Sequence, residues 1–193
     1  MYFCDFVAIF SFATKALSLK AEQNENQKYE NSNLLDRKVG LQKHPEGGWF
    51  KEIYRSGDVV PETGLPENFN GKRNFSTSIY FLLEGGDFSA FHRIKSDEIW
   101  HYYTGNSAIE ILTIENRRIK KQLVGNNLEN DEQLQVVAPK NKWFAARLKN
   151  TQGFGLVGCT VSPGIHFDDF EMADEKLIDE FPELKEEIVP FLR

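Results

Sequence analysis

The chain has 193 residues, with 23 Lys and Arg against 29 Asp and Glu, and therefore a formal net charge of −6 at pH 7. Proteins that bind nucleic acid through the phosphate backbone are usually basic, so this balance argues against that function. No stretch reaches the roughly 18 to 20 consecutive apolar residues of a membrane span. The length suits one domain with a substantial core, and the 16 Phe residues favour a β-rich core filled by large aromatic side chains.

The N-terminal segment differs in composition from the rest of the chain. Residues 1–19 are rich in apolar side chains, but Asp5 stands where a secretory signal would carry basic residues. Residues 20–33 are polar and rich in Asn and Glu, and such a segment buries too little apolar surface to order itself. We therefore expect residues 1–33 to be a disordered or weakly helical extension, followed by a folded domain over residues 34–193. A cytoplasmic location is the preferred interpretation, with secretion as the alternative.

Beyond residue 34 the sequence alternates between short apolar runs and turn residues. Residues 34–42 predict a short helix that ends at Gly40, and residues 57–74 carry repeated Gly, Pro and Asn, which indicate a long loop. From Asp174 onwards, apolar residues at helical spacing predict one or two amphipathic helices. The predicted strands are residues 49–55, 76–83, 88–94, 98–103, 108–114, 119–124, 134–138, 143–148 and 154–161. Many short strands with few helices predict an all-β sandwich or jelly roll.

The segment GDFSAFHRIKSDEIWHYYTG, residues 86–105, is the most informative part of the sequence. Turn glycines at its two ends bracket His92 and Glu98, which stand on two short apolar strands. Such an arrangement places a polar pair in the mouth of a β-barrel. The spacing matches the first cupin signature, Gly-x5-His-x-His-x3,4-Glu-x6-Gly, except that Ile94 replaces the second histidine.

A second stretch keeps Pro139 of the second cupin signature but has Phe144 in place of its histidine. Further matching blocks are residues 44–50, 78–83, 91–105 and 157–171. The chain resembles the fifth cupin family, an uncharacterised family formerly called a domain of unknown function. The resemblance implies an all-β, RmlC-like, cupin-type jelly-roll barrel (a double-stranded β-helix) with a short N-terminal helix and C-terminal amphipathic helices. It also implies the homodimer that is common among dTDP-sugar epimerases of this fold.

His92 and Glu98 are the first candidate catalytic residues. In metal-binding cupins, three histidines and one glutamate hold a divalent ion, and imidazole and carboxylate suit such metals. Ile94 and Phe144 stand at two of those four positions and cannot ligate, so we expect no firm cofactor. A divalent metal at His92 and Glu98 stays an alternative. Sugar epimerases of this fold pair a catalytic histidine with an aspartate, which by analogy makes Asp169 a partner of His92.

The candidate ligand-binding residues lie on predicted strands and are Tyr80, Trp100, Tyr102, Trp143, Arg147 and His101. Aromatic side chains suit a small-ligand pocket, which is mostly apolar with a few polar anchors, and Arg147 suits an anionic group. Strand alternation puts His101 on the face opposite Glu98, so an interface role is preferred for it unless a bulge shifts the strand. The turn HPEGG, residues 44–48, could bring His44 and Glu46 to the barrel mouth, although a purely structural turn is the preferred interpretation.

These features predict a small-molecule pocket inside the barrel. The leading hypothesis is a metal-independent isomerase or epimerase that acts on a sugar or nucleotide sugar. Two alternatives stay open: a module that binds a small ligand without turnover, and a metal-dependent cupin enzyme with a reduced ligand set. The predicted partners are a small ligand and a second copy of the chain, with no nucleic acid and no membrane. A second titratable group beside His92 would favour the enzyme over the binding module.

Overall fold

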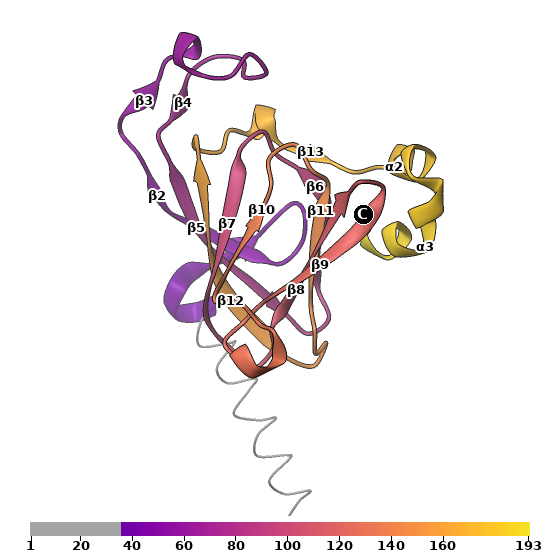
Figure 1. The fold of residues 1–193 in the computed structure, drawn as a ribbon. Helices are drawn as coiled ribbons and strands as arrows, with labels where there is room; N and C mark the ends of the chain where they lie inside the picture. Colours follow the sequence, from indigo (N-terminus) through magenta and orange to yellow (C-terminus); the bar gives the residue numbers. More distant parts are fainter. Residues whose placement is uncertain (1–35) are drawn as a thin grey trace, which may run out of the picture. The chain divides into compact units, whose positions relative to one another are not determined.

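Two antiparallel sheets face each other in the computed structural model, which describes residues 36–193 (Figure 1). The described residues before Leu41 form a short π-helix, Asp36–Gly40, within the range predicted for a short helix. The residues from Leu41 to Arg193 form one compact unit. The predictions for residues 1–33 lie outside the described residues. The fold is mostly β, with short helices concentrated near the C-terminus, and it confirms the predicted jelly roll.

The larger sheet has the strand order β1-β2-β5-β12-β7-β10, and the smaller sheet has the order β13-β6-β11-β8-β9. The strands of the larger sheet are β1 (Gln42–Lys43), β2 (Trp49–Arg55), β5 (Thr77–Glu84), β12 (Phe154–Ser162), β7 (Asp97–Gly105) and β10 (Gln135–Ala138). Those of the smaller sheet are β13 (Glu171–Met172), β6 (Phe88–Arg93), β11 (Phe144–Leu148), β8 (Ile109–Glu115) and β9 (Arg118–Val124). Most connections cross from one sheet to the other, so residues close in sequence end on opposite walls of the barrel.

Each strand range predicted from the sequence corresponds to an observed strand whose ends lie within two residues of the prediction. The predicted loop at residues 57–74 is only partly a loop. It contains β3 (Val59–Val60), η2 (Glu62–Gly64) and β4 (Arg73–Asn74), which form a small arm beyond the two sheets (Figure 1). A two-residue strand is too short for apolar alternation to reveal it, and this explains why β3 and β4 were not predicted.

The main core lies between the two sheets, and β11 shows how alternation builds it. Phe144, Ala146 and Leu148 face this core, whereas Ala145 contributes to a second apolar cluster on the other side of the smaller sheet. Both faces of β11 therefore carry buried residues, as expected for a central strand with a covering layer on its outer side, although Arg147 on the outer face is exposed.

Short C-terminal helices provide that covering layer. They are α2 (Lys176–Glu180), η5 (Pro182–Leu184), α3 (Lys185–Ile188) and η6 (Val189–Phe191). Their buried residues Leu177, Leu184, Ile188 and Phe191 pack in one cluster with Phe91 and Leu112 of the smaller sheet. This confirms the predicted amphipathic helices, although Pro182 and Pro190 divide them into short pieces. Within residues 36–193, no helix combines the length and the apolar character that crossing a membrane requires.

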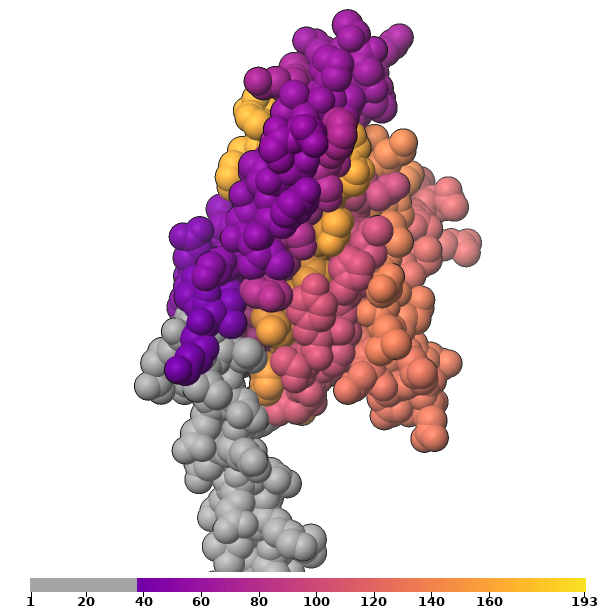
Figure 2. Space-filling model, turned by 90° about the vertical axis from the view of Figure 1, so that its left-hand side faces the viewer, coloured from indigo at the N-terminus to yellow at the C-terminus, as the bar shows by residue number. Residues whose placement is uncertain are grey.

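The strands of the larger sheet run side by side across the face shown in Figure 2. Tyr80 of β5 and Tyr103 of β7 meet edge to face with ring centroids 5.8 Å apart, and Tyr103 is 50 % exposed. The homodimer that the resemblance implies stays a prediction, and this aromatic surface is where we expect a second copy to bind.

Replacement of Ile188 by Ala tests the role of the C-terminal helices. The Ile188 side chain is fully buried, so its truncation should lower the free energy of unfolding by about 2 to 4 kcal/mol through lost burial and a residual cavity. Urea denaturation measures this change. The neighbouring Val189, which is 49 % exposed, is the control, and Val189→Ala should have little effect. Equal effects of the two substitutions would show that the helices do not pack as described.

Candidate functional site

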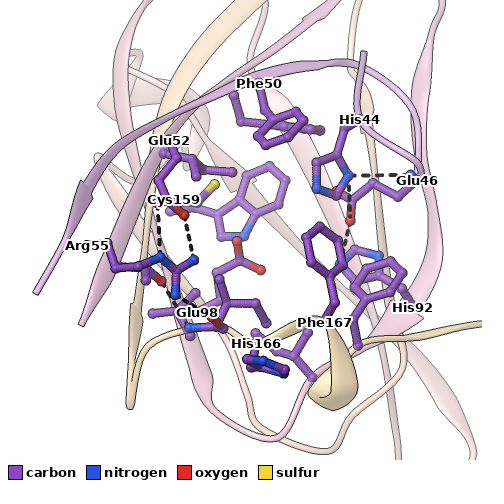
Figure 3. Close-up of a pocket in the computed structure, with 18 residues that line it drawn as sticks. His44, Glu46, Phe50, Glu52, Arg55, His92, Glu98, Cys159, His166 and Phe167 are labelled. Atoms are coloured by element: carbon purple, nitrogen blue, oxygen red, sulfur yellow. Dashed lines mark hydrogen bonds and ion pairs between the residues drawn. The ribbon is translucent and has the colours of Figure 1, made fainter. Parts of the chain in front are cut away.

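A cavity of about 270 Å³ lies inside the barrel between the two sheets (Figure 3). Its wall is mainly apolar, with aromatic rings from Phe50, Phe81, Trp100, Phe167 and Phe170. Its polar lining residues are His44, Glu46, Glu52, Arg55, Thr77, His92, Glu98, Cys159 and His166. This composition is typical of small-ligand sites, in which a few polar groups orient a mostly apolar contact.

The turn formed by residues 44–48 carries two of these polar side chains into the barrel. The His44 N–H donates to the Gly48 carbonyl, and the Gly47 N–H donates to the His44 carbonyl, at 3.1 and 3.0 Å. Gly47 and Gly48 have φ angles of +109° and +70°, which side chains with a Cβ rarely adopt. The Ala90 N–H donates to the Glu46 carbonyl at 2.8 Å, so the turn is fixed to strand β6.

The Glu46 carboxyl group is held from two sides. Ser89 Oγ donates a hydrogen bond to Oε1 at 2.9 Å. Oε2 lies 3.2 Å from His92 Nε2 and 3.4 Å from His44 Nδ1 (Figure 3). Burial raises the pKa of Glu46, and the nearby His44 and Ser89 only partly oppose this.

The His92 ring has a defined proton arrangement. Its Nδ1 lies 2.8 Å from the Ala90 carbonyl oxygen, which only accepts, so Nδ1 carries a proton. Nε2 is therefore the ring nitrogen that faces Glu46 Oε2, at 3.2 Å, and a proton exchanged between these two atoms gives either a neutral pair or imidazolium and carboxylate. Burial lowers the pKa of His92, and with the raised pKa of Glu46 this favours the neutral pair. Phe144 and Phe170 hold the ring at centroid distances of 4.1 and 5.3 Å.

Glu98 projects into the cavity from β7, on the wall opposite His92 and Glu46 (Figure 3). It is 8 % exposed and forms no ion pair with any residue between 36 and 193. Burial raises the pKa of Glu98 to about 7, the nearby Glu46 raises it further, and His92, Cys159 and Trp100 act in the opposite direction. A carboxyl group with such a pKa both accepts and releases a proton near neutral pH.

Of the predicted site residues, His92, Glu98 and Trp100 line this cavity. Tyr80 and His101 stand at positions that alternate with cavity-facing neighbours, so they lie on the other face of the larger sheet. β7 does contain an irregularity, opposite Leu156 and Val157, but it lies beyond His101 and leaves the alternation there intact. Tyr102 packs against the main core and donates to the Ser107 carbonyl at 3.4 Å.

The remaining predicted residues lie outside the cavity. Trp143 is buried in the second apolar cluster, with the Arg93 guanidinium 4.4 Å from its ring centroid. Arg147 is exposed and binds Glu110, with Nη2 2.7 Å from Oε2. The structure also gives His92 a carboxylate partner different from the expected Asp169. Asp169 is bound by Arg73 at 2.5 and 2.6 Å instead, and it forms no hydrogen bond with His92 in the described part of the chain.

The ligand set of metal-binding cupins does not fit this site. Ile94 lines the cavity at one ligand position, and Phe144 packs on the His92 ring at another. Among residues 36–193, no group of three or more His, Cys, Asp or Glu side chains is arranged to hold a metal ion.

The sequence favours a purely structural role for the turn at residues 44–48, so it does not identify His44 and Glu46 as residues of the cavity. The available signal was the paired glycine after Glu46, which allows a tight return of the chain toward β6. The contact with His92 itself depends on the packing of the turn against a strand more than 40 residues away, as the Ser89–Glu46 hydrogen bond shows.

The cavity and its fold can be compared with known proteins. The family model described as "Cupin superfamily (DUF985)" matches residues 35–173. The chain belongs to this cupin family. An uncharacterized protein of Saccharomyces cerevisiae is 32 % identical over 139 residues, which cover 67 % of this chain and 68 % of the yeast protein.

Two solved structures of similar sequence share the fold. A protein of Shewanella oneidensis is 33 % identical with a TM-score of 0.72, over 82 % of this chain and 95 % of the bacterial chain. A hypothetical protein of Leishmania major is 30 % identical with a TM-score of 0.73, over 83 % of this chain and 97 % of the other. These similarities establish the cupin family and its barrel, and they name no reaction.

The pH dependence of stability tests the burial of Glu98. Its pKa is 4.5 in its ordinary environment and about 7 in the folded protein, so the folded state binds the additional proton between these values. The contribution of Glu98 to the free energy of unfolding is therefore about 3 kcal/mol more favourable below pH 4.5 than above pH 7. This contribution is lost as the pH rises from 4.5 through 7. Glu98→Gln should remove this decline.

Urea denaturation across this pH range measures the effect. Glu129→Gln, on the exposed η3 turn (Leu128–Asn130), is the matched control and should keep the wild-type pH dependence. Parallel curves for wild type and Glu98→Gln would contradict the described environment of Glu98.

Proposed function

We propose that this protein binds a small molecule inside the barrel and transfers a proton on it, as an isomerase or epimerase does. The observation that carries this proposal is the His92–Glu46 pair, in which Nε2 and Oε2 lie 3.2 Å apart while Nδ1 is bound by the Ala90 carbonyl. The proton between these two atoms is the one that the pair can give or take.

His44 extends this unit. The Glu46 N–H donates to His44 Nδ1 at 3.4 Å, so this nitrogen is an acceptor, and it also faces Glu46 Oε2. A proton on Oε2 therefore has two acceptor nitrogens within reach. Burial lowers the pKa of His44 as well, which keeps its ring neutral near pH 7. A buried carboxyl group between two neutral imidazoles suits reversible proton transfer.

The apolar wall supports the same function. Phe50, Phe81 and Phe170 reduce the water around the pair, and electrostatic interactions strengthen where water is excluded. Glu98 supplies a second titratable group on the opposite wall, which was the feature expected to favour an enzyme over a binding module. The sugar or nucleotide-sugar substrate suggested by the resemblance stays a prediction.

Hydrogen exchange into candidate substrates tests the proposed reaction. The full-length protein is incubated in D2O with neutral sugars, nucleotide sugars and small amines, and deuterium at carbon is followed by NMR. We expect exchange in at least one compound, and His92→Gln should slow it by about a hundredfold or more. His101→Gln is the matched control, because His101 lies on the other face of the sheet and its loss should leave exchange unchanged.

Compounds that raise the melting temperature but show no exchange would contradict the proposed reaction. They would favour the alternative, in which the cavity binds a ligand without turnover.

A further inference from the structure

Among residues 36–193, no Lys or Arg forms an ion pair with the two buried acidic side chains of the cavity. Glu46 and Glu98 both line it and are 6 % and 8 % exposed. Among the described residues of its wall, Arg55 is the only Lys or Arg. Both carboxylate oxygens of Glu52, which also lines the cavity, bind the Arg55 guanidinium at 3.0 and 2.6 Å, so Arg55 already has a carboxylate partner.

Glu46 and Glu98 differ in how their polar atoms are satisfied. Glu46 has Ser89 and two imidazoles around it. Glu98 has no ion pair among residues 36–193, and its polar neighbours are the Cys159 thiol and the Trp100 indole. The Trp100 Nε1 atom is itself buried without a hydrogen-bond partner in the described residues. On the β7 wall, Glu98 therefore has neutral donors beside it and no cation.

Asp169 is a buried carboxylate outside the cavity, and it differs from Glu98 because cations bind it. It is 6 % exposed, like Glu46 and Glu98, but Arg73 binds both its oxygens and Lys95 Nζ lies 3.2 Å away. Burial alone would raise the pKa of Asp169, and these two cations outweigh that effect and lower it. A buried carboxylate without such a cation is costly, and Glu98 lowers this cost by taking up a proton, so a cation that arrives from outside can take the place of that proton.

The aromatic wall favours the same kind of ligand. Rings of Phe50, Phe81, Trp100, Phe167 and Phe170 line the same cavity as Glu98, and Figure 3 labels Phe50 and Phe167 among them. The negative faces of aromatic rings attract organic cations, most strongly where water is excluded. The cavity of about 270 Å³ lies just below the range of about 300 to 1,000 Å³ for drug-sized ligands, so the body of the ligand is small.

We propose that the cavity binds an organic ammonium ion with a small apolar or aromatic body, and that Glu98 binds its charged group. This inference rests on the proposed function, because it names the ligand class of the same cavity. The ammonium group replaces the missing cation beside Glu98, and the body of the ligand lies against the aromatic rings. The Glu46–His92 pair on the opposite wall keeps its shared proton and faces the other side of the ligand.

Proton release follows from this placement. Near pH 7 about half of the Glu98 carboxyl groups carry a proton, because burial raises the pKa of Glu98 to about 7. The groups that act on its pKa include Glu46, His92 and Cys159, none of which is a fixed cation. The cavity wall also carries His44, Glu52, Arg55 and His166, and Arg55 is bound to Glu52. An ammonium ion that binds the carboxylate form displaces the Glu98 proton, so binding releases protons and strengthens as the pH rises.

Isothermal titration calorimetry with three probes of one shape tests the ligand class. The probes are benzylammonium, benzyl alcohol and benzoate, each titrated into the full-length protein. We expect benzylammonium to bind about tenfold or more tightly than either of the others, with protons released to the buffer at pH 6 to 7. Glu98→Gln should weaken benzylammonium binding by about tenfold, whereas the surface control Glu129→Gln should not change it.

Equal or tighter binding of benzyl alcohol or benzoate would overturn the inference, as would no detectable benzylammonium binding at about 10 mM. If Glu98→Gln does not fold, the order of the three probes and the proton release on wild type still decide the question.

The outcomes are independent of the proposed proton transfer, because that reaction is judged by deuterium exchange and by His92→Gln. A cavity that prefers an uncharged ligand could still pass the exchange test.

Discussion

The contact between Glu46 Oε2 and His92 Nε2 is the interaction on which the rest of the site depends. It requires a turn with two glycines at positive φ, a hydrogen bond from Ala90 to that turn, and a carbonyl that fixes the other ring nitrogen. Because Nδ1 is occupied, Nε2 is the ring nitrogen that can exchange a proton with the Glu46 carboxyl group. The two side chains therefore act as a single acid–base group.

The barrel sets the pKa values of Glu46, His92 and Glu98 by burying these side chains away from water on two opposed walls. His92 comes from the smaller sheet and Glu98 from the larger one, since the chain crosses between sheets from β6 to β7. The same crossing places an apolar core directly beneath both residues, with Phe144 against the His92 ring. Burial shifts the pKa of Glu46 and Glu98 upward and that of His44 and His92 downward, so it favours the uncharged form of each group, and it brings the pKa of Glu98 to about 7.

Local patterns predicted the strands and two of the central residues, because apolar alternation and motif spacing are properties of neighbouring residues. His92 and Glu98 followed from the spacing of one segment, and both line the cavity. Trp143 and Arg147 were chosen from a correctly predicted strand, but their positions alternate with Phe144, so they face away from the barrel interior. The pairing of Glu46 with His92, and of Asp169 with Arg73, depends on contacts between distant segments that no local pattern encodes.

The measurement that tests the central claim most directly is ¹⁵N NMR of the His92 ring in wild type and in Glu46→Gln. The account predicts a neutral ring near pH 7 with the proton on Nδ1, and a change in the Nε2 signal when Glu46 is replaced. A ring that carries its proton on Nε2 with Nδ1 bare, or an Nε2 signal that does not respond to Glu46→Gln, would contradict the shared proton and the proposed acid–base pair.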